Sequence, residues 1–172
     1  AFSSRDEAVG AIVGKGHKVD LTGTIVYTPD ASPLTHEAFL NWMDGNNFMQ
    51  PACFFRRRAW EECGPLRTDL RIALDVDLWI KMSECYKFGR VEQTIAYAYQ
   101  HENAKTTAEV PQMRAETSLL IAEHGGWDIA RENLLRQAEK LAEARRKIQR
   151  VQTHPLYRLL RPFYKVFRRL SS

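Results

Sequence analysis

Hydrophobic and polar positions near both ends of the first hundred residues follow the patterns of β-strands. Residues 9–28 contain two β-rich runs around Asp20-Leu21-Thr22-Gly23, which predicts a hairpin or two adjacent strands with Gly23 in the turn. Residues 90–99, RVEQTIAYAY, predict a further strand, and HENAKT after them reads as a loop. Residues 48–55 are apolar but include Pro51, which argues against a regular central strand.

The other periodic segments have helical spacing. Apolar residues stand at positions 74, 78, 82 and 86, which predicts a helix that begins near Asp75 and buries Leu78 and Met82. A short helix from Thr35 through Trp42 is also expected. Three more are predicted over residues 56–63, 109–123 and 127–150, with glycines at 64, 125 and 126 ending the first two. Strands mixed with helices indicate an α/β protein.

The last 18 residues combine large apolar and basic side chains. On a helical wheel Leu156, Leu160, Phe163, Phe167 and Leu170 lie on one side, and five basic residues lie opposite. Pro155 can open this helix and Pro162 should kink it. The pattern predicts an interfacial helix over residues 155–170 on an anionic membrane surface. Docking on the protein's own domain is the alternative. Nucleic acid is not expected, because no groove-reading motif accompanies the charge.

Charge is divided unevenly along the chain. The formal net charge is +4, yet residues from 145 onward hold nine Lys or Arg and no Asp or Glu. Residues 1–144 therefore carry 16 basic and 21 acidic side chains, so only the tail favours an anionic partner. The three cysteines lack the spacing of a zinc site and are expected to be free thiols in a reducing cytosol.

Asp75 and Asp77 form the clearest chemical signal. They stand two residues apart at a predicted helix start, beside Trp79. Backbone N–H groups and the macrodipole at a helix N-terminus favour an ionised carboxylate, and an ionised, oriented Asp can act as a general base. The structural alternative is that one Asp caps the helix while the other faces solvent.

Neighbouring motifs favour the chemical interpretation. Between Asn47 and Thr106 the chain reads Asn47-Phe48-x-Gln50-Pro51, Phe54-Phe55-Arg56-Arg57, Gly64-Pro65-Leu66, Asp75-x-Asp77-Leu78-Trp79, and Ala98-Tyr99-x-His101 with Lys105-Thr106. In order, spacing and residue type these motifs resemble family 2 glycosyltransferases of the GT-A fold. With residues 9–27 included, the resemblance covers about residues 9–124.

The resemblance implies a role for each matching residue. Asp75 would be the catalytic base that deprotonates the acceptor hydroxyl for inverting attack on the sugar, and Asp77 would orient the acceptor or support the loop. Gln50 and Pro51 would line the acceptor cleft. Trp79 would contact the sugar or, more in keeping with its surroundings, pack in the core. His101 would lie near the donor diphosphate and its metal, although it could also simply end a strand. Leu74 replaces the Glu that many members carry beside the base.

A complete GT-A domain also needs a donor-binding half with a metal-binding Asp-x-Asp, and no such half precedes Asp75 in this sequence. The expectation is therefore the second, acceptor-side half of a GT-A domain with a mixed sheet over residues 1–126, followed by helices over 127–172. The complete enzyme would use a nucleotide sugar and Mn²⁺ or Mg²⁺.

The expected function is transfer of a sugar to a glycan or lipid-linked acceptor, as in polysaccharide biosynthesis, at the inner face of the membrane. Two alternatives stay open: a non-catalytic module that binds membranes or partner helices through residues 127–172, and a glycan-binding remnant.

Overall fold

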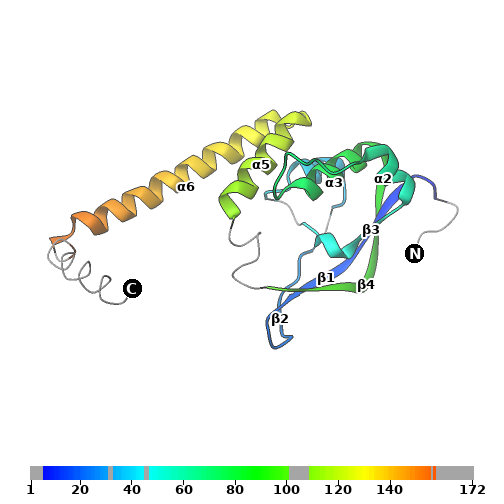
Figure 1. Cartoon of the computed structure of the whole chain (residues 1–172), viewed down its shortest axis with the longest axis horizontal. Coiled ribbons are helices and arrows are strands. Elements are labelled where there is room, and N and C mark those ends of the chain that lie inside the picture. The colour runs from blue at the N-terminus through cyan, green and yellow to red at the C-terminus, as the bar shows by residue number, and fades with distance from the viewer. Residues whose placement is uncertain (1–5, 31–32, 45–46, 101–108, 156, 158–172) are drawn as a thin grey trace. The chain divides into compact units, whose positions relative to one another are not determined.

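A computed structural model describes residues 6–30, 33–44, 47–100, 109–155 and 157. Within them the protein is α/β, with an open four-stranded sheet and helices (Figure 1). The chain divides into two compact units, Ala1–Asn133 and Leu134–Ser172. His101, Lys105, Thr106 and nearly all of the predicted tail helix lie outside the described residues.

The sheet is built around one long strand, β1 (Val9–Val19). β4 (Lys87–Tyr99) runs parallel to β1 along its whole length. β2 (Ile25–Tyr27) and β3 (Cys53–Phe55) pair antiparallel with opposite ends of β1, through Lys18 and Val19 and through residues 11–13 respectively. Because a strand has two edges, β2 and β3 share the edge that β4 leaves open. The sheet is therefore mixed, as the sequence indicated.

The predicted hairpin is confirmed by the β1–β2 pair. Gly23 has φ of +85°, a conformation that favours glycine. The turn is held by Asp20, whose Oδ1 accepts hydrogen bonds from the main-chain N–H groups of Thr22 and Thr24. These bonds, with the Thr22 side-chain bond foremost, lower the pKa of Asp20.

The apolar segment around Pro51 contains a strand after all, although a short one. Pro51 lies in a 3₁₀ helix, η1 (Gln50–Ala52), because a residue without an N–H fits a helix start better than a strand interior. The three residues after η1 form β3. The expectation that Pro51 argues against a regular central strand agrees with the structure, because β3 has only three residues and pairs with β1 alone.

The helices of the first unit form close to the predicted positions. α1 (His36–Leu40) is capped by the Thr35 side chain, and α2 (Arg57–Cys63) ends at Gly64. α3 (Leu74–Cys85) and α5 (Val110–Glu123) follow, the second ending before Gly125. α1 is shorter than expected, because the chain turns at residues 41–44 instead of continuing to Trp42.

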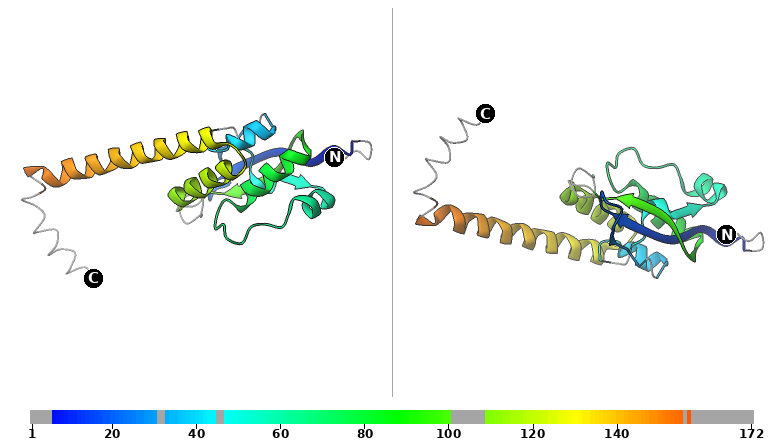
Figure 2. Two further views of the ribbon diagram at one scale, coloured as in Figure 1. Left: turned by 90° about the horizontal axis from the view of Figure 1, so that it is seen from above. Right: turned by 90° about the horizontal axis from the view of Figure 1, so that it is seen from below.

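The core lies between α3 and the sheet. Val76, Trp79 and Ile80 of α3 belong to the same buried cluster as Ala11 and Val13 of β1. Figure 2 shows α3 over β1 from above, and the strands in front of α3 from below. Gly10 of β1 lies so close to Tyr86 that an added Cβ would be 2.5 Å from the Tyr86 Cβ. This close approach fixes where the end of α3 meets the sheet.

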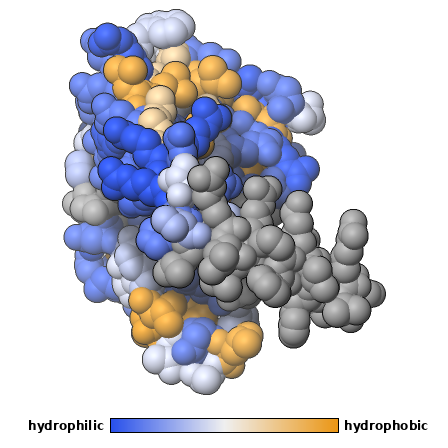
Figure 3. Space-filling model, turned by 90° about the vertical axis from the view of Figure 1, so that its left-hand side faces the viewer, coloured by the Kyte–Doolittle hydropathy of each residue, from blue (hydrophilic) through white to orange (hydrophobic). Residues whose placement is uncertain are grey.

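α6 (Trp127–Thr153) is the longest helix and extends three residues beyond the predicted segment. Several of its large apolar side chains are exposed, as are others on β2 and β4; Figure 3 shows such residues among hydrophilic ones on one face. No helix in the described part of the chain is both long and apolar enough to cross a membrane. Cys53, Cys63 and Cys85 are free thiols, as expected.

Candidate functional site

Asp75 occupies the second position of α3 and is partly buried. Its Oδ1 accepts a hydrogen bond from the Val76 N–H at 2.9 Å. Removal from water raises the pKa of Asp75, and the main-chain hydrogen bonds from Val76 and from Asp75 itself oppose this only in part. The helix N-terminus was expected to favour the ionised carboxylate, but the pKa of Asp75 moves in the opposite direction because burial outweighs the main-chain hydrogen bonds. A raised pKa makes the carboxylate a stronger base.

The main-chain N–H groups just before α3 are bound by a side chain of another helix. Glu116 of α5 places Oε2 2.8 Å from the N–H of Ile72 and 3.1 Å from that of Ala73. The Arg71 N–H approaches the same oxygen at 3.2 Å. Burial alone would raise the pKa of Glu116, but these bonds and one from Gln112 lower it overall. Glu116 therefore acts as a cap supplied from another helix.

Asp77 is buried and surrounded by cationic side chains. Its carboxylate is 1% exposed, and Lys81 Nζ lies 2.6 Å from Oδ2. That contact is an ion pair without hydrogen-bond geometry, since Oδ2 has no hydrogen-bond partner. His124 Nε2 lies 3.3 Å from Oδ1 and Arg67 lies 3.9 Å from it. We call Asp77, Arg67, Lys81 and His124 the Asp77 cluster.

The Asp77 cluster joins α3 to α5 and to the loop before α3. Arg67 pairs with Glu123 at the end of α5 and, at 2.6 Å, with Asp69 in the loop. His124 also contacts Glu84 at 3.0 Å. Of the two roles considered for Asp77, loop support matches these contacts. Direct contact with an acceptor would require the carboxylate to leave its cationic partners.

Trp79 lies in the core and is 2% exposed. Its ring is 5.5 Å from that of Phe48 and 6.3 Å from that of Phe88, tilted or edge-on to them, arrangements that aromatic pairs prefer. The packing interpretation therefore fits, and no ring face is open to a sugar.

Gln50 and Pro51 are exposed on η1, whose buried neighbours Met49 and Ala52 pack against Ala96 of β4. Asp77 and Trp79 are buried, so the five predicted site residues do not form one accessible surface. Two remain accessible on η1 and one, Asp75, is partly accessible on α3. His101, the weakest candidate, lies outside the described residues.

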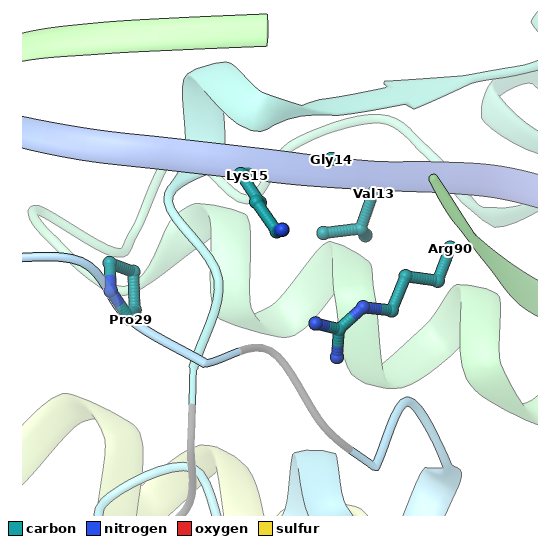
Figure 4. A pocket seen from close by; sticks show the side chains of 5 residues that line it. All are labelled: Val13, Gly14, Lys15, Pro29 and Arg90. Carbon is teal, nitrogen blue, oxygen red and sulfur yellow. The ribbon is translucent and has the colours of Figure 1, made fainter. Parts of the chain in front are cut away.

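A small hollow lies elsewhere on the first unit, between β1, β4 and the loop that contains Pro29. Val13, Gly14, Lys15, Pro29 and Arg90 line it. Figure 4 shows the Lys15 and Arg90 side chains entering it from β1 and β4.

Both cations in this hollow are matched by acids. Glu92 lies 3.0 Å from Lys15 and 3.0 Å from Arg90, and Asp30 lies 3.1 Å from Arg90. With its charge balanced, the hollow does not have the character of an anion site.

No group of three or more His, Cys, Asp or Glu side chains within the described ranges is arranged to hold a metal ion. Comparison with known proteins gives no match, either to a protein-family model or to a curated protein. The chemical case consequently depends on the residues around the start of α3.

Sequence reasoning missed Glu116 and three members of the Asp77 cluster. Asp77 and Lys81 are four residues apart on one helix, a spacing that favours an ion pair and could have been noticed. Arg67 and His124 are 10 and 47 positions from Asp77, and Glu116 is 43 positions from Ala73. Nothing in a single sequence indicates these pairings.

Proposed function

We propose that this chain contributes the acceptor side and the catalytic base of an inverting, nucleotide-sugar-dependent glycosyltransferase of the GT-A type. Asp75 is the base, and the exposed Gln50 and Pro51 of η1 are the residues that the resemblance assigns to the acceptor cleft. Asp77, with its cluster, positions α3 and does not touch the acceptor.

One observation carries the proposal. Asp75 is a desolvated carboxylate with a raised pKa, yet no cation is paired with it among the described residues. The neighbouring acid Asp77 shows the usual arrangement, because it is buried beside the cationic side chains of Lys81 and Arg67. A buried, unpaired acid costs stability and is a recognised mark of a functional site. The motif resemblance around Asp75-x-Asp77-Leu78-Trp79 supplies the reaction class.

The chemical step needs little from the base except position and proton affinity. An acceptor hydroxyl gives its proton to an Asp75 carboxylate oxygen as its own oxygen forms a bond to the anomeric carbon. The nucleoside diphosphate departs with the electron pair of the broken bond. A divalent metal would neutralise the leaving diphosphate. We propose that its ligands belong to the donor-binding half, with His101 as a possible neighbour.

The test is transfer of labelled sugar by the complete gene product in membrane extracts. A panel of UDP-, GDP- and dTDP-linked sugars would be supplied with Mn²⁺, and label in glycan or lipid-linked product counted. Asp75→Asn should lower transfer by about 100-fold or more, the usual contribution of a general base. Asp128→Asn is the matched control, since Asp128 is an exposed acid in the first turn of α6.

Stability separates a catalytic loss from misfolding. The folded pKa of Asp75 is raised above its ordinary value of 3.8, so ionisation at neutral pH opposes folding. Asp75→Asn should therefore unfold at an equal or higher urea concentration at pH 7, an advantage that disappears below about pH 4. If no nucleotide sugar is consumed above the level of extracts lacking the protein, the proposed function is wrong. If transfer survives in Asp75→Asn, only the role of Asp75 is wrong.

The second candidate is a non-catalytic module that binds a membrane or a partner helix. The observation in its favour is the exposed apolar surface of α6.

We propose that residues 155–170 hold the enzyme at the cytoplasmic face of an anionic membrane. Deleting residues 154–172 should release the protein from sedimented vesicles while Asp75→Asn remains bound; the non-catalytic alternative predicts the same release with no transfer activity to lose.

A further inference from the structure

The second unit exposes a narrow apolar stripe along α6. Leu134, Leu141, Ile148 and Val151 are exposed by 47%, 54%, 56% and 57% respectively. The first three are spaced by seven residues, and Val151 follows Ile148 by three. In a heptad frame Leu134, Leu141 and Ile148 take the a positions, Ala144 and Val151 take d positions, and the d position after Leu134 is the polar Gln137. From Leu141 to Val151 the apolar residues follow the alternating steps of three and four that form a coiled-coil seam.

The positions beside this seam carry only positive charge. In the same heptad frame, Arg145 lies at an e position, and Lys140 and Lys147 lie at g positions. The acids of the segment, Glu139 and Glu143, lie at f and c positions, and Glu143 Oε1 lies 2.7 Å from Lys147 Nζ in an ion pair between two exposed side chains. All three flanking cations are exposed. Because e and g residues face the partner across a coiled coil, they decide which helix can pair.

We propose that the stripe on α6 is a docking site for a helix of another protein, whose own apolar seam is flanked by Asp or Glu. Acidic flanks on the partner would lie opposite Lys140, Arg145 and Lys147, while its a and d side chains would cover Leu141 and Ile148. This interaction is additional to sugar transfer and does not depend on it.

A second copy of the chain is a poorer occupant. In a parallel pair, each g residue faces the e residue five positions later on the partner. Lys140 would thus face Arg145 of the other copy, twice in the symmetric dimer. An antiparallel pair would bring the g residues Lys140 and Lys147 of the two copies together. Like charges in either arrangement oppose pairing.

A membrane surface is also a poorer occupant of this segment. Interfacial helices bury a broad apolar face rich in Trp, Phe and Leu. The seam between Leu134 and Val151 contains no aromatic residue, and Ala144 leaves it shallow. Two residues per heptad make the narrow stripe of a coiled coil.

The test uses the full chain and two synthetic helices of about three heptads. Both probes carry Ile at a and Leu at d positions; one has Glu at every e and g position and the other has Lys. Fluorescence anisotropy of the labelled probes gives affinity. The Glu-flanked probe should bind at least about tenfold more tightly at low salt, since three flanking cations change from attraction to repulsion.

Three variants locate the binding surface. Ile148→Lys should abolish binding of the Glu-flanked probe, and circular dichroism should show α6 intact because Ile148 is exposed. Arg145→Glu should weaken binding about fivefold or more, with some gain for the Lys-flanked probe. Arg146→Glu is the matched control: it changes net charge equally from an f position and should leave affinity within about twofold.

Several results would overturn the proposal. These are equal affinity for the two probes, no binding of either, or equal losses in Arg145→Glu and Arg146→Glu. Sedimentation showing that the chain pairs with itself, with Ile148→Lys restoring the monomer, would assign the stripe to a second copy. Binding to phosphatidylserine vesicles that Ile148→Lys removes would assign it to a membrane.

Discussion

The Asp77 cluster predicts an unequal response to the loss of two acids that share one arginine. Asp77 and Asp69 both pair with Arg67, but the Asp77 side chain is 1% exposed and that of Asp69 is 65% exposed. Asp77→Ala removes the acid from between Lys81, His124 and Arg67, whereas Asp69→Ala removes an ion pair that water already screens. The comparison therefore sets a buried acid with several close partners against an exposed acid, both of which lie near Arg67.

The magnitude can be estimated from the surroundings. Removing one partner of a fully buried ion pair costs about 3–5 kcal/mol. The cations around Asp77 keep some contact with water, Lys81 being 32% exposed, so they can be partly rehydrated. We expect about 2–3 kcal/mol for Asp77→Ala and a much smaller loss for Asp69→Ala, because water already screens that ion pair. For a unit of this size the loss in Asp77→Ala lowers the melting temperature by roughly 10 °C.

Urea unfolding followed by tryptophan fluorescence is a suitable assay, since Trp79 is buried beside the cluster on α3. A double-mutant cycle with Lys81→Met would isolate the coupling free energy between Asp77 and Lys81. The argument is refuted if the two Asp→Ala variants lose equal stability, or if the Asp77–Lys81 coupling is zero. Either result would mean that Asp77 does not hold α3 to its neighbours.

Two further predictions concern packing and pH. Glu116 has a lowered pKa in the folded state, so its contribution to stability is full above the ordinary value of 4.5 and is lost as pH falls through the folded pKa. Glu116→Ala should flatten the stability–pH curve in that acidic range, and a curve parallel to the parent would contradict the capping role. Gly10→Ala should cost about 1–3 kcal/mol by overpacking against Tyr86. Gly89→Ala, whose added Cβ would meet nothing closer than 3.5 Å, should change the stability little. Equal melting temperatures for the two variants would show that β1 and Tyr86 can move apart at no cost.

Local patterns predicted most of the secondary structure. The turn at Gly23, the helix starting at Leu74 and the stop at Gly125 depend on backbone preferences and periodicity within about ten residues. The strand at Cys53–Phe55 was harder to predict from the sequence, because Pro51 lies two residues before it and disfavours a strand only where the proline itself stands. The long parallel pairing of β1 with β4 joins segments about 78 residues apart, for which spacing gives no cue.

The candidate site was predictable only in part, for a geometric reason. Residues two apart on a helix are turned about 200° from each other, so Asp75 and Asp77 could not share one environment. The helix N-terminus was expected to favour the ionised form of Asp75, but burial of the side chain outweighs the main-chain hydrogen bonds and raises its pKa. Whether an acid is buried with or without a cation depends on residues such as Arg67 and His124, which only the tertiary structure brings close.

Glu116 has a practical consequence for anyone who would cut or graft this protein. The start of α3 is held by a carboxylate 43 positions later in the chain than Ala73, and Arg67 is held by Glu123. A fragment that ends soon after β4 would keep Asp75 but would lose Glu116 and Glu123, the two carboxylates that hold the start of α3 and Arg67 in place. The junction of any minimal fragment, chimera or tag should therefore lie beyond His124, so that Asp75, the proposed base, is kept together with Glu116 and Glu123.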